Sequence, residues 1–123
     1  MDAERRDRDG TAFRDLNKNG RLDPYEDPRR PVEERVKDLV SQMTLDEKAG
    51  MMFHAMVGLN ADGSLVEGES QVGSISTSEL VLTKKMNTFN VLQGTKPRLM
   101  AQWYNRVQAL AESTRLGIPI TIA

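Results

Sequence analysis

The chain has 123 residues and a mass of 13.8 kDa, close to the usual size of one domain. Its 17 basic and 18 acidic side chains leave a formal net charge of −1, which argues against nucleic acid or an anionic membrane as a partner. The absence of cysteine excludes disulfides and thiolate chemistry. No apolar run approaches the roughly 18 residues of a membrane span, and the charged start, MDAERRDRDG, lacks the apolar region of a complete secretory signal.

The chain changes character at residue 31. Residues 1–30 carry eight acidic and eight basic side chains and few large apolar groups, so we interpret them as a charged lead-in to a domain over residues 31–123. The domain begins with an amphipathic helix, since Pro31 suits a first helical turn and the following apolar residues recur at helical intervals. These residues are Val32, Val36, Leu39, Val40 and Met43.

A second helix and a strand are predicted next. Thr44 and Glu47 have the T-x-x-E spacing of a capping box, so a short helix should begin at Leu45 and run towards Gly50. The apolar run at residues 51–57 predicts a buried strand. A glycine-punctuated stretch follows, and it predicts a turn around Asp62 and Gly63.

The second half of the chain alternates strands with helices. Residues 71–75 predict a short strand, and Ser76 with Glu79 predicts the cap of a helix over residues 78–86. A strand is predicted at residues 88–92. This alternation is typical of parallel α/β units.

The clearest helix is predicted over residues 97–116. Trp103 lies on its apolar face, which favours a core position over ligand stacking, and Gly117 is the expected stop. The final residues, 118–123, predict a strand buried on both faces of a parallel sheet. We therefore predict an incomplete α/β domain from a longer protein, since such a strand would otherwise leave an apolar edge exposed.

The sharpest motif is a twelve-residue calcium loop of the EF-hand type, D-x-[DN]-x-[DN]-G-x₅-E, at residues 15–26. Calcium takes six to eight oxygen ligands, and Gly20 provides the sharp turn around the ion. A metal-free turn rich in Asp, Asn and Gly is the alternative interpretation. The predicted ligands are the side chains or carbonyls of Asp15, Asn17, Asn19, Arg21, Asp23 and Glu26.

Catalytic groups are not evident from spacing. His54 is the only histidine, and we interpret it as a core or strand-end residue. No G-x-S-x-G elbow or phosphate-binding glycine loop occurs. The remaining carboxylates favour a solvated face; they are Glu33, Glu34, Asp38, Asp62, Glu67, Glu69 and Glu112. No catalytic or substrate-binding residue is assigned.

Two separated blocks resemble glycoside hydrolase family 3, the β-glucosidase-like enzymes. Residues 31–48 have the pattern P-x-E-x-R-V-x-D-L-x-x-x-M-T-x-x-E-K, and residues 105–119 have N-R-x-Q-x-x-A-E-x-T-R-L-G-I-P. The resemblance covers nearly the whole chain and is least diagnostic at residues 59–95. It is specifically a resemblance to the N-terminal region of the family.

The resemblance implies the first units of a TIM-barrel-like (β/α) catalytic domain, preceded here by the EF-hand-like loop. It also implies retaining hydrolysis of terminal β-glycosidic bonds in oligo- or polysaccharides or β-glucosides, and a periplasmic or secreted location. In the family the aspartate nucleophile lies on a later strand of the barrel and the acid/base glutamate comes later still, so we expect this chain alone to be inactive. The alternative is a calcium-binding, dockerin-like interaction module, although a second calcium loop is absent from the sequence.

Overall fold

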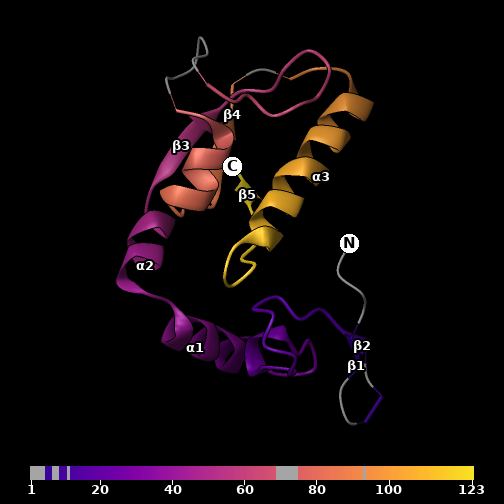
Figure 1. Cartoon of the computed structure of the whole chain (residues 1–123), viewed down its shortest axis with the longest axis vertical. Helices are drawn as coiled ribbons and strands as arrows, with labels where there is room; N and C mark the ends of the chain where they lie inside the picture. Colours follow the sequence, from indigo (N-terminus) through magenta and orange to yellow (C-terminus); the bar gives the residue numbers. More distant parts are fainter. Residues whose placement is uncertain (1–4, 7–8, 11, 69–74, 93) are drawn as a thin grey trace. The chain divides into compact units, whose positions relative to one another are not determined.

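The computed structural model describes residues 5–6, 9–10, 12–68, 75–92 and 94–123. The chain divides into two compact units, Met1–Thr44 and Leu45–Ala123, here named the N-terminal and the C-terminal unit. Figure 1 shows their helices and strands in chain order. Every helix within the described ranges is too short or too polar to cross a membrane.

The N-terminal unit combines a small hairpin with two helices. Strands β1 (Arg5–Arg6) and β2 (Ala12–Phe13) pair in antiparallel fashion, which the charged composition of the lead-in did not predict. A single 3₁₀ turn, η1 (Pro24–Glu26), packs against α1 (Val32–Gln42). Helix α1 begins directly after Pro31, which confirms the predicted helix start.

The apolar stripe of α1 is present but exposed. Val32, Val36 and Val40 retain 64%, 52% and 43% of their accessible surface, and no residue inside the helix is buried. Met43, directly after the helix, is buried. The periodicity therefore predicted the helix correctly. Its apolar side chains are not covered by the rest of the N-terminal unit.

The C-terminal unit is built on a three-stranded parallel sheet. Helix α2 (Leu45–Met51) leads into β3 (His54–Val57), and β4 (Thr88–Val91) lies between β3 and β5 (Thr121–Ile122). The register pairs His54 with Thr88 and Thr88 with Thr121. The chain visits neighbouring strands in sequence order, which confirms the predicted parallel α/β arrangement.

Two helical connections cover one face of this sheet. The first is η2 (Glu79–Thr83), a π-helix, and the second is α3 (Pro97–Ser113). Both contribute to a single hydrophobic core with the strands, and the core confirms the buried position predicted for Trp103, which is 1% exposed. The buried members of the core are Val57, Leu80, Val81, Phe89, Trp103, Val107, Ala111 and Ile120.

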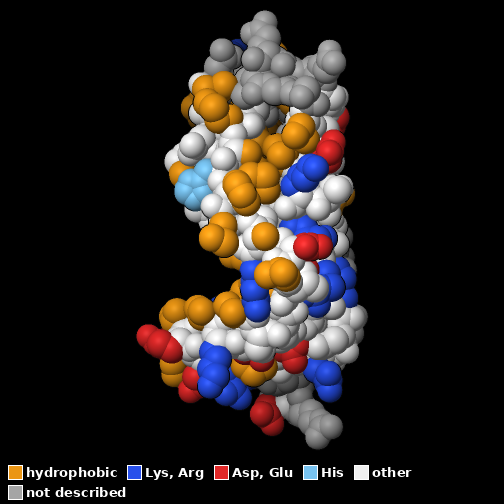
Figure 2. All heavy atoms as spheres, turned by 90° about the vertical axis from the view of Figure 1, so that its left-hand side faces the viewer, with side chains coloured by type: hydrophobic (Ala, Val, Ile, Leu, Met, Phe, Trp, Pro, Cys, Tyr) orange, Lys and Arg blue, Asp and Glu red, His pale blue; other side chains and the backbone are white. Residues whose placement is uncertain are grey.

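The opposite face of the sheet carries exposed side chains. His54, Asn90 and Thr121 are exposed, and Met56 retains 50% of its surface. Alternate strand residues point to opposite faces, so these side chains lie on the side away from α3. Figure 2 shows hydrophobic side chains exposed around the histidine on this part of the C-terminal unit.

The predicted strands are longer than the observed ones. In the run 51–57, Met51 ends α2 and β3 begins only at His54; Met52 and Phe53 are 82% and 64% exposed. At the end of the chain the strand is Thr121–Ile122, and Thr121 is exposed. Burial on both faces was therefore wrong for the strand predicted at residues 118–123, and the run at 51–57 is only partly buried, because the helices cover one face only.

The predicted helix ends also shift. Helix α3 stops at Ser113 instead of residue 116, and the Thr114 hydroxyl donates to the Ala111 carbonyl at 2.6 Å. Gly117, the expected stop, adopts a φ of 58° in the turn that follows. The helix predicted at 78–86 is the shorter η2, in which the Lys84 amide donates to the Glu79 carbonyl at 3.0 Å. Positions 71–74 of the strand predicted at 71–75 lie outside the described residues.

Gly50 in α2 lies close against the backbone of Lys84 and Lys85. A Cβ atom at this position would lie 2.5 Å from the carbonyl oxygens of Lys84 and Lys85, and backbone atoms cannot move aside cheaply. We predict that Gly50→Ala lowers the free energy of unfolding by about 1–3 kcal/mol, despite the higher helix propensity of alanine. Urea denaturation measures this difference.

Gly94→Ala is the matched control, because a Cβ there would meet no atom within 4 Å. We expect its free energy of unfolding to stay within about 0.5 kcal/mol of the unmodified chain. Equal stability of the two variants would contradict the close approach at Gly50.

Candidate functional site

The predicted calcium loop is a series of turns closed by its own side chains. Asp15 accepts hydrogen bonds from the amides of Asn19 at 3.0 Å and Gly20 at 2.9 Å. Asn17 Oδ1 accepts from the Asn19 amide at 3.2 Å, and Asn19 Oδ1 from the Arg21 amide at 2.8 Å. The Asn17 and Asn19 bonds are Asx turns to the amide two residues ahead, whereas Asp15 reaches the amides four and five residues ahead.

Positive φ angles make these turns possible at two positions. Gly20, predicted as the sharp turn, has a φ of 80°, a conformation that glycine adopts without steric cost. Lys18 has a φ of 62°, which is uncommon for a residue with a Cβ atom. Its ammonium group donates to the Leu16 carbonyl at 2.8 Å and thereby supports the turn.

Glu26 closes the loop from its other end. Its Oε1 accepts from the Leu16 amide at 2.6 Å and the Asn17 amide at 3.3 Å, while its Oε2 accepts from the Asp23 amide at 3.0 Å. Glu26 is 8% exposed, so these three amides satisfy an otherwise costly buried carboxylate. Pro24 begins η1 directly after Asp23.

Three of the predicted ligand side chains meet at one point. The amide nitrogens of Asn17 and Asn19 lie 2.5 Å and 2.6 Å from the same oxygen of Asp23. A calcium ion requires oxygen here, so each amide would have to turn its oxygen inward. Among the described residues, no three Asp, Glu or His side chains form a metal-binding group.

Helix α1 supports the loop from one side. Asp38 accepts from the Tyr25 amide at 3.1 Å and from Gln42 Nε2 at 3.0 Å, and Gln42 Oε1 accepts from Asn17 Nδ2 at 3.3 Å. Burial, and secondarily the charge of Glu26, raise the pKa of the Tyr25 hydroxyl, which therefore stays protonated. The sequence placed Asp38 on a solvated face, and its role as a loop contact could not be derived from helical spacing.

A second candidate region lies at the carboxyl end of the parallel strands. Residues 60–64 form a hairpin directly after β3, as the Asp62-Gly63 turn signal predicts, and an isolated bridge joins Leu59 to Leu65. In parallel α/β folds the loops at this end of the sheet build the ligand sites. The hairpin lies at this end of the sheet.

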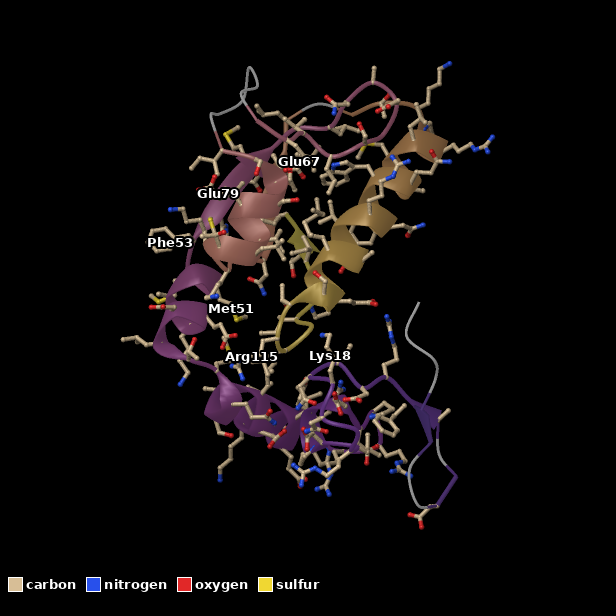
Figure 3. The ribbon with its side chains drawn as sticks, viewed as in Figure 1. Lys18, Met51, Phe53, Glu67, Glu79 and Arg115 are labelled. Atoms are coloured by element: carbon tan, nitrogen blue, oxygen red, sulfur yellow. The ribbon has the colours of Figure 1, made fainter. Side chains whose placement is uncertain are left out.

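A cavity of about 120 Å³ lies at the opposite, amino end of the strands. Its lining includes the buried Asn87, whose Oδ1 has no hydrogen-bond partner, and the ion pair of Arg115 with Glu47 at 2.5 Å. Met51 and Arg115, which both line the cavity, are labelled in Figure 3. Because the amino end of such sheets serves stability rather than chemistry, we assign no reaction to this cavity.

The other residues considered for catalysis are dispersed. His54 is exposed at the first position of β3, in agreement with the interpretation as a strand-end residue. Glu67 accepts from the Ser78 hydroxyl at 2.7 Å, so it is a structural contact in addition to a solvated side chain. Glu33 and Glu34 are exposed on the first turn of α1.

Comparison with known proteins supplies the decisive observation. The chain is 44% identical, over 93% of its length, to the periplasmic β-glucosidase/β-xylosidase of Dickeya chrysanthemi. It is 41% identical over 80% of its length to the probable β-glucosidase C of Aspergillus oryzae, and 38% identical over 89% to β-glucosidase C of Emericella nidulans. The chain is therefore similar in sequence to a segment of proteins named β-glucosidases.

The β-glucosidase relatives are much longer than this chain. The aligned segments span 17%, 15% and 17% of the Dickeya, Aspergillus oryzae and Emericella proteins. No family model matches the sequence. The likeness therefore covers most of this chain and about a sixth of each relative.

The hydrogen bonds of Glu26 generate a prediction about the loop. In Glu26→Gln, one carboxylate oxygen becomes an NH₂ group that cannot accept a hydrogen bond from an amide. We expect a loss of about 1–3 kcal/mol in the local opening free energy, seen as faster amide hydrogen exchange at Leu16, Asn17 and Asp23. Glu34→Gln, an exposed change on α1, should leave these rates unchanged.

Proposed function

We propose that this sequence is the N-terminal region of a retaining β-glucosidase of glycoside hydrolase family 3. The identity of 44% over 93% of the chain to a named β-glucosidase/β-xylosidase carries the proposal. The motif blocks at residues 31–48 and 105–119 support it, because they occur in the order that the family resemblance implies. The substrates would be β-glucosides or oligosaccharides, and the Dickeya relative's name favours a periplasmic location.

The topology supports a barrel origin for the C-terminal unit. Helices η2 and α3 both pack on the same side of β3, β4 and β5. (β/α) barrels keep every helix outside a closed sheet, and three sequential strands with both helices on one side have the arrangement of their first units. Met56 and Asn90, on the open face, would then point into the barrel.

The chemistry of retention explains why activity would need the longer protein. A retaining glycosidase uses two carboxyl groups about 5 Å apart, one as nucleophile and one as acid/base. By family resemblance the nucleophile belongs to a later barrel strand and the acid/base comes later still in the longer protein. We therefore propose that the present chain supplies the first barrel units and has no hydrolytic activity alone.

Activity measurements test this proposal. We expect a longer protein that begins with this sequence to hydrolyse an aryl β-glucoside, and the 123-residue chain to show none of this activity. An aryl β-xyloside should be the second substrate tested, because the Dickeya relative is named for both activities. Hydrolysis by the isolated chain, or by neither protein, would contradict the proposal.

We further propose that the loop at residues 15–26 binds Ca²⁺ as a structural clip. The match of residues 15–26 to the loop pattern, the convergence of Asn17 and Asn19 on Asp23, and the closing position of Glu26 support this assignment. Asp15, Asn17, Asn19, Asp23 and Glu26 would supply side-chain oxygens, and Arg21 its carbonyl. The formal charge of these ligands is −3, with Lys18 nearby, so the affinity should be weak for a loop of this type.

Calorimetric titration with CaCl₂ tests the clip, with hydrogen exchange as the structural readout. We expect binding that protects amides within residues 15–26 only, and at least about tenfold weaker binding in Asp15→Asn. Glu34→Gln is the control and should bind normally. Protection spreading through residues 45–123 would instead favour the calcium-binding interaction module, and absence of binding would refute both.

A further inference from the structure

The cavity of about 120 Å³ at the amino end of the strands has a buried floor and an exposed rim. Its floor contains Val81, Leu116 and Ile120, each of which is 3% exposed or less. At its rim, Leu82 retains 45% of its accessible surface and the Arg115 side chain retains 52%. The cavity therefore runs from the surface of the C-terminal unit towards its core.

Contacts between distant elements hold the walls of this cavity in place. The Ile120 carbonyl accepts from Gln108 Nε2 at 2.7 Å, and the Ile120 amide donates to Gln108 Oε1 at 3.1 Å. Helix α3 thus fixes one part of the floor. The ion pair of Arg115 with Glu47 at 2.5 Å joins the turn after α3 to α2. The space is therefore formed by the fold before any molecule enters it.

One polar atom in the cavity wall lacks a partner. Asn87 lies directly before β4 and is 9% exposed, and no described residue donates a hydrogen bond to its enclosed Oδ1. Its backbone carbonyl accepts from the Thr121 amide at 2.7 Å, so the pairing with β5 leaves the side-chain oxygen unused. A buried acceptor without a donor destabilises a protein. Because Asn87 lines the cavity, a donor that enters the cavity would supply the missing partner.

The lining of the cavity defines the chemistry of its ligand. Most of the wall is apolar, and Met51 and Met86 contribute unbranched side chains that adapt to a bound molecule. Glu47 and Arg115 compensate each other's charge, so the unpartnered oxygen calls for one neutral donor. An engineered apolar cavity of about 150 Å³ holds benzene, and the space of about 120 Å³ here is of comparable size. A single ring with one hydroxyl group meets both requirements.

We propose that this cavity binds a small molecule of the phenol class, whose hydroxyl group donates to Asn87 Oδ1 while its ring packs against the apolar floor. The site is a binding site without a reaction, and the inference does not rest on the proposed glycosidase function. Burial of the ring favours binding, and the hydroxyl group adds a preference over a ring that has no donor. Since α2, η2 and the turn after α3 all line the cavity, an occupant would stabilise the C-terminal unit.

Titration of the whole 123-residue chain with phenol and with toluene tests the site, with NMR chemical shifts as the readout. We expect phenol to shift the signals of the floor residues and to bind at least about threefold more tightly than toluene, which has the ring but no donor. In Asn87→Leu, an apolar replacement of similar size, phenol should lose this advantage. Asn90→Leu, a matched change on the exposed face of β4, is the control and should retain it.

Leu82→Trp keeps the inference testable if Asn87→Leu fails to fold. A tryptophan at the rim should obstruct the cavity and weaken the binding of both compounds. Leu92→Trp is its control, because Leu92 is similarly exposed, at 47%, and does not line the cavity. Equal binding of phenol and toluene to the unmodified chain, shifts confined to residues outside the cavity, or no binding would each overturn the inference.

Discussion

The C-terminal unit depends on one face of a short parallel sheet being covered by both of its helical connections. Phe89, in the central strand β4, is 0% exposed and shares a core with Trp103 of α3 and Val81 of η2. Burial of large aromatic side chains is the main stabilising contribution available to so small a sheet. The positions of β3 and β5, and of the loops that follow the strands, depend on this packing.

The loops at residues 15–26 and 60–64 are stabilised differently from the core. Around residues 15–26 and in the hairpin at 60–64, short polar side chains bond to nearby backbone amides and fix the turn locally. Longer-range contacts then attach each loop to a helix: Asp38 of α1 holds the first, and Arg106 of α3 holds the second. In both loops, hydrogen bonds between near neighbours fix the shape of the turn, whereas bonds to a distant helix fix its position in the unit.

The open side of the sheet is consistent with the proposed barrel. Parallel sheets are normally covered on both faces, yet His54, Asn90 and Thr121 are exposed here. The β-glucosidase relatives are about six times longer than the aligned segment, so a longer protein has ample chain to complete the structure. The same exposed face explains why the strand predicted at residues 118–123 is not buried on both sides.

The sequence by itself determined the order and type of most elements, because helical spacing, Pro31, the capping residues and the Asp62-Gly63 turn act over a few neighbouring residues. It also identified the calcium-loop pattern and the resemblance to glycoside hydrolase family 3. Only the tertiary structure decided where α3 ends, how short the strands are, and that the apolar face of α3 is buried while that of α1 is exposed. Those features depend on contacts between distant residues, such as Gly50 with Lys84 and Arg106 with Gly63, which no local pattern encodes.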